Sequence, residues 1–511
     1  MTKTVLKSVM VAAMLAVALS ACRKASEESR PVPGELTLPS AQAGQSSDAE
    51  ITLIPPGFER AASGLSFLFH VNGDVFGTVD PIDGDVLFLN PSGKQLGAAR
   101  LPDGFSVRDI DIGSSIVLRG ATSAVVIPRT GAIPAQLLSI PLPASSTSVK
   151  RNGRALEQSY KGSGGSGTLS VGPRGTGKVL NVTFLGFDQD GRPYAYWEEG
   201  DGRRVDSWAG RFGSDGKLDA AALLDFSDFD DIPAVPVAVT PSGSLLMMQP
   251  TEDSVELNEL TLVDGRAGAA TEKKVGSPPV NILDVGDAKV PPVPNISLPA
   301  VRGKAPPYDA AFGAATLARA RQYLDAQWTL KPGNFLQSGI QHNCEPEQGL
   351  VWSRPTRLSE AKLGKTVSSL PYKWGGFDSV DQFKSRMASS RPALAGNVCT
   401  CRQAEYNGCM VARAAGVDCS GFVSRAWGLK AHNGTFKLAS IAAPLPTIFD
   451  LKPGDILNRP GNHVRLFVGF EPGPEVRLRT LESAVSCGGV CERVFTPAQL
   501  QYYRPMRLRR P

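Results

Sequence analysis

The sequence predicts a multidomain protein in which an all-β part is followed by an α+β part. Three observations support this class. The chain has 511 residues, which is too long for one ordinary hydrophobic core. Between residues 50 and 276, Asp-Gly and Asn-Gly pairs separate short apolar runs, as in antiparallel hairpins. Residues 308–511 combine a segment of helical periodicity with later alternating strands.

Regular turn signals divide residues 50–276 into short predicted strands. Turn spacing of about 10 to 15 residues suits an antiparallel domain, and the region has the length of about five propeller blades. A propeller is therefore the first expectation, and a sandwich or open barrel is the alternative. His70 is expected to be a structural histidine, no catalytic constellation is found, and the ligand of this part stays unknown. Strands are expected at Phe67–Val71, Val86–Leu89, Tyr194–Trp197 and Trp208–Phe212.

Residues 1–22 have the layout of a secretion signal. Lysines precede an apolar run, Val9–Leu19, that is too short to span a membrane. The segment Leu19-Ser20-Ala21-Cys22 resembles the lipobox of bacterial lipoproteins. This resemblance implies lipid attachment to Cys22, with an ordinary cleaved signal as the alternative. The lack of an Asp just after the cysteine implies the outer membrane, facing the periplasm. Residues 23–49 are polar and Pro-containing and are expected to be a flexible tether.

Charge and composition exclude some classes of function. The formal charge is only +5, and no phosphate-cradling Gly-Lys-Ser/Thr loop occurs, so neither a nucleic-acid partner nor a cofactor is predicted. Eight cysteines suit an exported protein in an oxidising compartment. With Cys22 assigned to lipid and Cys419 to chemistry, six remain as disulfide candidates. Sequence does not fix their pairing, although a flexible stretch between the last two could let them pair; the six are Cys344, Cys399, Cys401, Cys409, Cys487 and Cys491.

A zinc site is the less favoured interpretation of part of this set. Cys399, Cys401 and Cys409 lie close together in sequence, but they lack the paired spacing of zinc ribbons. No metal site is therefore predicted.

A proline-rich linker and a helix open the second part. Eight prolines in residues 277–307 prevent a helix and disfavour a central strand. The following residues predict an amphipathic helix that ends at Lys331-Pro332-Gly333. An apolar stripe and charged positions are expected to alternate within Ala314, Leu317, Ala318, Arg321, Leu324, Asp325 and Trp328.

The hexapeptide Asp418-Cys419-Ser420-Gly421-Phe422-Val423 is the strongest candidate for chemistry. Apolar residues recur after it at helical spacing, so a helix is expected to begin near Cys419. The positive end of a helix dipole lowers the pKa of a cysteine and favours the nucleophilic thiolate. A structural cysteine or half of a disulfide is the alternative.

A cysteine nucleophile needs a base and a group that orients the base. His463 starts a predicted strand, where it could face the N-terminus of the cysteine helix. Glu482 lies on the next predicted strand and could orient the imidazole, with Asn462 or Ser483 as alternatives. His342 and His432 lie in loop-like contexts and are not expected to take part.

These residues resemble the NlpC-type family of cell-wall cysteine peptidases, which have a papain-like fold. The resemblance covers residues 370–485 and four pieces in the family order: Pro371-Tyr372-Lys373-Trp374-Gly375-Gly376, Asp418 to Val423, Lys452-Pro453-Gly454-Asp455, and His463-Val464. It implies a papain-like C-terminal domain with Cys419 as nucleophile and His463 as base. Tyr372 would line the substrate cleft, and Trp374, Asp418 and Ser420 are further substrate-binding candidates.

Two features depart from the family pattern. Residues 377–417 are inserted before the nucleophile and are expected to form a disulfide-pinned wall or lid. The orienting position carries Glu482, whereas the family commonly has His there.

The expected function is that of a lipid-anchored cysteine hydrolase that cleaves amide bonds in peptidoglycan stem peptides. Two alternatives stay open. The same core could act on another amide or as an acyltransferase, or the protein could be a non-catalytic binding or scaffold lipoprotein of the envelope.

Overall fold

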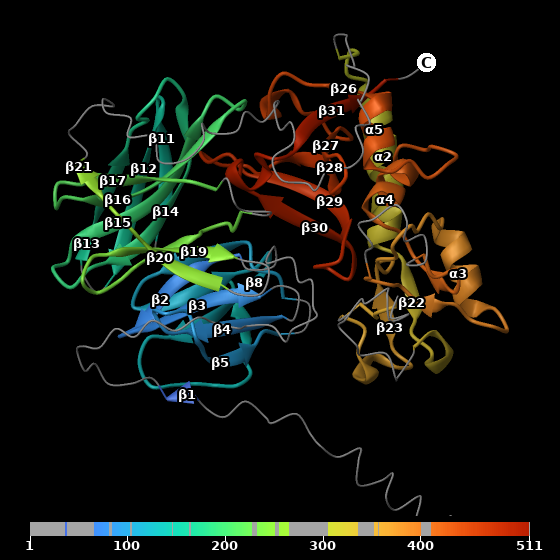
Figure 1. The fold of residues 1–511 in the computed structure, drawn as a ribbon, viewed down its shortest axis with the longest axis horizontal. Coiled ribbons are helices and arrows are strands. Elements are labelled where there is room, and N and C mark those ends of the chain that lie inside the picture. The colour runs from blue at the N-terminus through green and yellow to red at the C-terminus, as the bar shows by residue number, and fades with distance from the viewer. Residues whose placement is uncertain are drawn as a thin grey trace, which may run out of the picture.

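The computed structural model describes residues 36–37, 66–80, 84–102, 105–145, 147–162, 165–226, 232–250, 255–264, 305–335, 352–355, 357–399 and 410–509. The secretion signal, Cys22, most of the tether and most of the linker lie outside these residues. So do His342, Cys344, Cys401 and Cys409. Figure 1 shows the β part on the left, a C-terminal sheet in the middle, and the helices α2 and α4 on the right.

The N-terminal part is all-β, as predicted. Its described residues form five main antiparallel sheets and a short pair of strands. The sheets contain β2–β5 (Leu68–Asn72, Val75–Asp80, Asp85–Leu89, Gln95–Arg100); β6–β8 and β10 (Asp109–Ile112, Ser115–Arg119, Ser123–Pro128, Ser139–Pro141); β11–β13 (Ser148–Asn152, Ala155–Gly162, Gly165–Val171); β14–β17 with β21 (Lys178–Phe187, Pro193–Gly200, Val205–Phe212, Leu218–Leu224, Val263–Asp264); and β18–β20 (Val237–Val239, Leu245–Pro250, Val255–Leu260).

Four of these sheets surround one apolar core. The first and last sheets are joined where Leu68 N–H donates to the Val235 carbonyl oxygen at 2.8 Å. The first and second are joined where Arg100 N–H donates to the Ala135 carbonyl oxygen at 2.8 Å, and β6 lies beside β14. The β11–β13 sheet instead packs against the outer face of the β14–β17 sheet. One of the five sheets therefore does not reach the shared core.

The predicted hairpins are confirmed. Turns with a positive-φ glycine connect β2 to β3 at Gly73, β14 to β15 at Gly191, β15 to β16 at Gly202 and β16 to β17 at Gly216. Each glycine is the second residue of an Asn-Gly or Asp-Gly pair. The turn needs a positive φ at this position, which glycine adopts without a steric penalty.

One short strand lies within the predicted tether. β1 (Leu36–Thr37) pairs antiparallel with β9 (Ala132–Ile133), so these two residues are attached to the β part and not free. The prediction of an unattached segment was wrong here, because the polar composition of residues 23–49 carries no signal for pairing with an available strand edge.

The C-terminal part combines helices with a six-stranded sheet in the order β26-β31-β27-β28-β29-β30. Its elements are α2 (Ala310–Leu324), β22 (Gln327–Thr329), β23 (Thr366–Ser368), α3 (Val380–Ala388), β24 (Leu394–Ala395), β25 (Ala414–Ala415), α4 (Cys419–Ala426), α5 (Thr435–Ile441), β26 (Ala442–Pro444), β27 (Ile456–Arg459), β28 (His463–Phe470), β29 (Leu478–Ala484), β30 (Gly489–Phe495) and β31 (Arg504–Leu508). One face of the sheet packs against α2 and α4, and an apolar core fills this interface.

Helix α2 differs from its prediction in length and in the face it buries. It ends at Leu324, and Trp328 lies in β22, paired with Val367. The fully buried residues are Gly313, Thr316, Ala320 and Tyr323. Leu317 and Leu324 of the predicted set are partly buried against the same core, whereas Ala314 and Ala318 are exposed. A Cβ atom at Gly313 would collide with the Pro453 carbonyl oxygen, so small residues let the helix approach that turn. This close contact selects the buried face against the hydrophobic periodicity.

The two parts share a buried interface. Leu180 and Val205 of the β part pack with Phe467 and Leu478 on the sheet face opposite α4. The turn between β28 and β29 inserts into the β part, where the Val182 N–H donates to Glu475 Oε1 at 3.0 Å. The interface between the two parts therefore contains both apolar contacts and a hydrogen bond.

Among the described residues, no helix has both the length and the apolar character needed to cross a bilayer.

Candidate active site

Cys419 is the first residue of α4, as predicted. Asp418 caps the helix, because its Oδ1 accepts from the Gly421 N–H at 2.6 Å. Gly421 lies against the Gly376 carbonyl oxygen, and a Cβ atom there would collide with it. The Trp-Gly-Gly element and the nucleophile loop therefore fit together through backbone contact, which explains the glycines in both motifs.

The thiol of Cys419 is buried, with 6% of the residue exposed. Burial raises its pKa to about 12, the Asp418 carboxylate adds to this, and backbone hydrogen bonds from Val464 and Ser420 act in the opposite direction. The expectation that the helix dipole lowers this pKa is not met, since desolvation outweighs it. The thiol is therefore protonated at rest and needs a base.

The predicted base and its predicted orienting residue are in contact. Glu482 Oε2 lies 2.6 Å from His463 Nε2, and the Glu482 side chain is completely buried. They stand on neighbouring strands, β28 and β29. A hydrogen bond to Nε2 orients the ring and leaves Nδ1 available for a second partner. The catalytic roles of both residues stay predictions.

Two arginines hold Glu482 in its charged form. Arg465 Nε lies 2.9 Å from Oε2, and Arg493 Nη1 lies 3.6 Å from Oε1. Burial alone would raise the pKa of Glu482, but Arg465, His463 and Arg493 outweigh it and hold the pKa well below its usual range. A permanent negative charge therefore lies beside His463.

Aromatic rings fix Arg465 and His463. The Arg465 guanidinium lies 4.2 Å from the centroid of the Tyr503 ring and 4.3 Å from that of Phe495. Tyr503 also meets the His463 ring edge-on, with centroids 6.5 Å apart. The preceding residue, Tyr502, donates its hydroxyl hydrogen to the Phe226 carbonyl oxygen of the β part. The β part therefore contacts the segment that supports the histidine.

Helix α4 and the sheet bring Cys419 next to Val464, the residue that follows His463. Val464, next to His463, packs with Cys419 in the same apolar core, and its backbone hydrogen-bonds to the thiol. Ser483 of β29 donates to the Val417 carbonyl oxygen at 2.8 Å and fixes the loop before the nucleophile. The Ser483 hydroxyl thus holds the backbone before Cys419 and does not orient the imidazole of His463.

The four predicted substrate-binding residues have different environments. Tyr372 is buried, and burial raises its pKa well above the usual value, with further contributions from Cys419 and Asp418. Trp374 is half-buried. Asp418 and Ser420 bond to each other at 3.0 Å and serve the cap of α4. Substrate binding stays a prediction for Tyr372 and Trp374, whereas the other two use their polar atoms inside the protein.

The structure also places His432 beside Asp418, although the sequence analysis did not expect it to take part in the site. His432 Nε2 lies 3.1 Å from both carboxylate oxygens of Asp418 and 3.3 Å from Ser420 Oγ. Burial alone would lower the pKa of His432, but the hydrogen bond and charge of Asp418 outweigh it, so the pKa is raised. No local motif marks this residue, since the fold alone brings the loop after α4 back to its N-terminus.

The insertion before the nucleophile is packed beside the site. It contains α3, and β24 pairs in parallel with β25, just before Cys419. Asp378 pairs with Arg386 at 2.8 Å and accepts from the Gly416 N–H at 2.9 Å. These contacts pack the described part of the insertion against the loop before Cys419, and its role as a wall or lid stays a prediction.

The cysteines that the structure describes agree with part of the disulfide prediction. Cys487 and Cys491 form a disulfide across the Gly488 turn, with Cα atoms 6.2 Å apart. Cys399 is also disulfide-bonded, and Cys419 is free. No group of three or more potential metal ligands occurs in the described part of the chain.

Comparisons with known proteins do not name a family. No family model matches the sequence, and no curated protein matches it. Among solved structures, a streptogramin B lyase shares 16% identity over 42% of this chain and 72% of that chain, with a TM-score of 0.20. The gluconolactonase XC5397 of Xanthomonas campestris shares 14% identity over 45% of this chain and 90% of that chain, with a TM-score of 0.20. The virginiamycin B lyase of Staphylococcus aureus shares 14% identity over 40% of this chain and 71% of that chain, with a TM-score of 0.18. Likeness at this level supports no argument about activity.

Proposed function

We propose that the protein is a cysteine hydrolase of amide bonds whose C-terminal part is a papain-like domain. The observation that carries the proposal is the buried contact of 2.6 Å between His463 and Glu482, next to the N-terminus of the Cys419 helix. A permanently charged carboxylate stabilises an imidazolium, which is the form the base takes after it accepts the thiol proton.

The proposed reaction has two steps. Cys419 Sγ attacks the amide carbon while its proton passes to His463, and the imidazolium then protonates the leaving amine. Water hydrolyses the resulting thioester, His463 takes a proton from that water, and the free acid and thiol are released. Each proton that His463 accepts is returned, so the residue ends each cycle unchanged.

The proposed substrate is the stem peptide of peptidoglycan, and the proposed location is the cell envelope. Support for the substrate comes from the resemblance of four sequence motifs to the NlpC-type family. Support for the location comes from the lipobox-like segment at Cys22, which implies a lipid anchor in the outer membrane. In the same proposal, the all-β part is a propeller-like domain.

Incubation with isolated peptidoglycan tests the proposal. The purified protein should release soluble fragments with new amino and carboxyl ends, identified by mass spectrometry. Cys419→Ala and His463→Gln should release none, whereas His70→Gln, a histidine variant in the β part, should behave as wild type. Fragment release by Cys419→Ala at the wild-type rate would remove Cys419 from the mechanism.

A second candidate is a non-catalytic envelope lipoprotein, which one observation favours. The Cys419 thiol is 6% exposed and its pKa is raised to about 12, a state typical of structural cysteines. Alkylation of the native protein by iodoacetamide separates the two. A catalytic thiol should react at neutral pH at a rate that depends on His463, and a structural thiol should react only after unfolding. Transfer of the acyl group to an added amine instead of water would identify an acyltransferase.

A further inference from the structure

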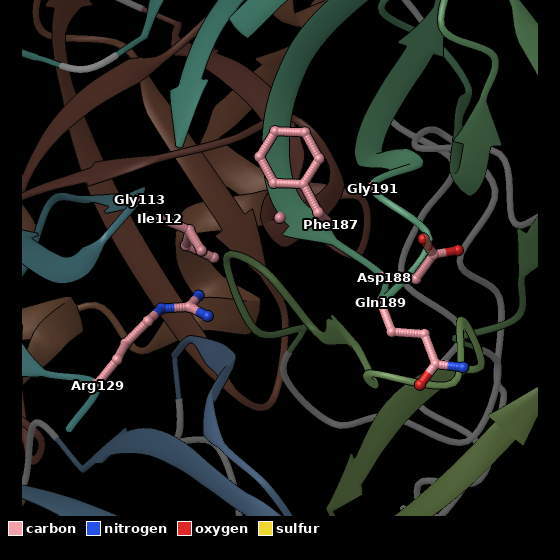
Figure 2. Close-up of a pocket in the computed structure, with 8 residues that line it drawn as sticks. Ile112, Gly113, Arg129, Phe187, Asp188, Gln189 and Gly191 are labelled. Carbon is pink, nitrogen blue, oxygen red and sulfur yellow. The ribbon is translucent and has the colours of Figure 1, made fainter. Parts of the chain in front are cut away.

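The β part contains a cavity of about 260 Å³ that lies apart from the Cys419 site. Figure 2 shows its lining, with the Arg129 side chain directed into the open space and Phe187 across from it. The lining of the cavity includes Ile112, Gly113, Arg129, Phe187, Asp188 and Gln189.

The cavity lies where turns from several sheets meet. Ile112 and Gly113 belong to the turn from β6 to β7, and Phe187 to Gln189 lead into the turn from β14 to β15. The Gln189 N–H donates to the Pro241 carbonyl oxygen at 2.8 Å, which joins this turn to the one between β18 and β19. These turns follow strands that surround the shared core, so the cavity lies at one end of that core.

Arg129 brings an unpaired positive charge to the cavity. Its Nε is buried and has no hydrogen-bond partner, and its guanidinium forms no ion pair with any residue that the structure describes. Burial lowers the pKa of Arg129, because desolvation disfavours the charged form. The side chain is half-buried, and an anionic ligand in the cavity would offset the part of its hydration that burial removes.

Neighbouring titratable groups do not neutralise Arg129. Burial lowers the pKa of His70 to about 4, the hydrogen bond to the Gly73 carbonyl opposes this, and the charge of Arg129 lowers it further. His70 is therefore uncharged at neutral pH.

Asp188 lines the cavity, but its carboxylate is already satisfied. Oδ2 lies 2.7 Å from Arg192 Nε and accepts from the Tyr194 hydroxyl at 3.1 Å. Oδ1 accepts from the backbone N–H groups of Asp190 at 3.0 Å and Arg192 at 2.9 Å. The negative charge of Asp188 is paired with Arg192, whereas the positive charge of Arg129 forms no ion pair within the described residues.

We propose that this cavity binds a singly charged carboxylate, from a small organic acid or from the C-terminus of a peptide. The carboxylate would pair with the planar Arg129 guanidinium through two parallel hydrogen bonds, and the apolar portion would contact Ile112. A single unpaired cation with no lysine in the lining matches one negative charge better than the two charges of a phosphate. The volume equals that of roughly eight or nine waters, which admits one terminal residue or a small acid.

Paired acids and amides test the charge requirement. N-acetylalanine and the peptide Ac-Ala-Ala-Ala are compared with their C-terminal amides by ligand-observed NMR, on full-length Cys419→Ala protein so that no probe is cleaved. The acid should bind at least about tenfold more tightly than its amide, because the amide offers the guanidinium no charge. Binding of the tripeptide acid alone would identify a peptide terminus as the source, and binding of both acids a small acid.

Substitution of Arg129 locates the site. Arg129→Met should abolish acid binding, and Arg129→Lys should weaken it, since lysine lacks the bidentate geometry. Arg203→Met, which removes an exposed arginine from the turn after β15, is the matched control and should bind as the parent protein does. The acid should raise the thermal midpoint of the parent protein but not that of Arg129→Met. Equal binding of acid and amide, undiminished binding by Arg129→Met, binding of inorganic phosphate alone, or no binding at about 10 mM would each overturn the proposal.

Discussion

Replacement of Glu482 by Gln is the sharpest test of the histidine pair. The substitution keeps the size of the side chain and one acceptor oxygen. That oxygen should take the Oε2 position, where it can accept from His463 Nε2 and face Arg465 at the wild-type distances of 2.6 and 2.9 Å. The amide group would then face Arg493. The variant therefore retains the orientation of the imidazole and loses only the buried charge.

The magnitude follows from the loss of a charge-assisted contact. A hydrogen bond to a charged group contributes about 1.5–3 kcal/mol, which corresponds to a rate change of roughly 10- to 150-fold. Glu482→Gln should lower hydrolysis and the alkylation rate of Cys419 at neutral pH within this range. Glu482→Ala should lose more, about 10²- to 10⁴-fold, since the imidazole loses its partner entirely.

Stability and activity can be separated by a second substitution. Loss of the Glu482 charge removes the buried ion pair with Arg465, and breaking a buried pair in this way costs about 3–5 kcal/mol. Glu482→Gln combined with Arg465→Met should recover stability but not activity.

The assay is the pH dependence of iodoacetamide alkylation, with thermal unfolding measured in parallel. Glu492→Gln on the neighbouring strand β30 is the control, because it removes a partly exposed carboxylate outside the pair. Wild-type alkylation by Glu482→Gln, or full recovery of activity with Arg465→Met, would refute the orienting role.

Three further predictions concern the same site and the thiols. Cys419→Ala and His463→Ala should each abolish hydrolysis with the fold intact, and the double variant should be little worse, which steady-state kinetics and circular dichroism would check. Denatured but non-reduced mature protein, in which Cys22 carries lipid, should take up iodoacetamide at Cys419 alone if the six other cysteines form three disulfides; mass spectrometry that finds several labelled cysteines would contradict this. Because the pKa of His432 is raised, its ion pair with Asp418 stabilises the fold below the unfolded value of about 6.5, and this contribution is lost as pH rises through the folded pKa. His432→Gln should therefore be most destabilised relative to wild type near pH 5.5, and the difference should shrink by pH 8.5; a pH-independent difference in thermal midpoint would exclude the ion pair.

Local signals predicted the features that depend on a few adjacent residues. Asn72-Gly73 and Asp190-Gly191 form turns because their conformation is set within the hairpin itself. The start of α4 at Cys419 was predicted because capping and periodicity lie within one segment. The contact between His463 and Glu482 was also anticipated, since the two residues lie on successive predicted strands.

Features set by distant contacts were not predicted. The buried face of α2 is chosen by the fit of Gly313 against Pro453, about which helical periodicity carries no information. The raised pKa of Cys419 results from burial by elements far apart in sequence. His432 reaches Asp418 only after the chain folds back, and its surrounding sequence has no marker of that contact.

The interface between the two parts has a consequence for how this protein can diversify. In many multidomain proteins, a domain attached through a linker can be exchanged for another while the remainder stays unaltered. Here Phe467 and Leu478 of the C-terminal sheet complete a core that includes Leu180 of the β part. In addition, Tyr502, which precedes the Tyr503 ring that contacts His463, donates a hydrogen bond to the Phe226 carbonyl oxygen. An exchanged β part would need to reproduce this complementary surface. A substitution on one side of this interface therefore constrains the residues on the other side, despite the proline-rich segment that joins the two parts.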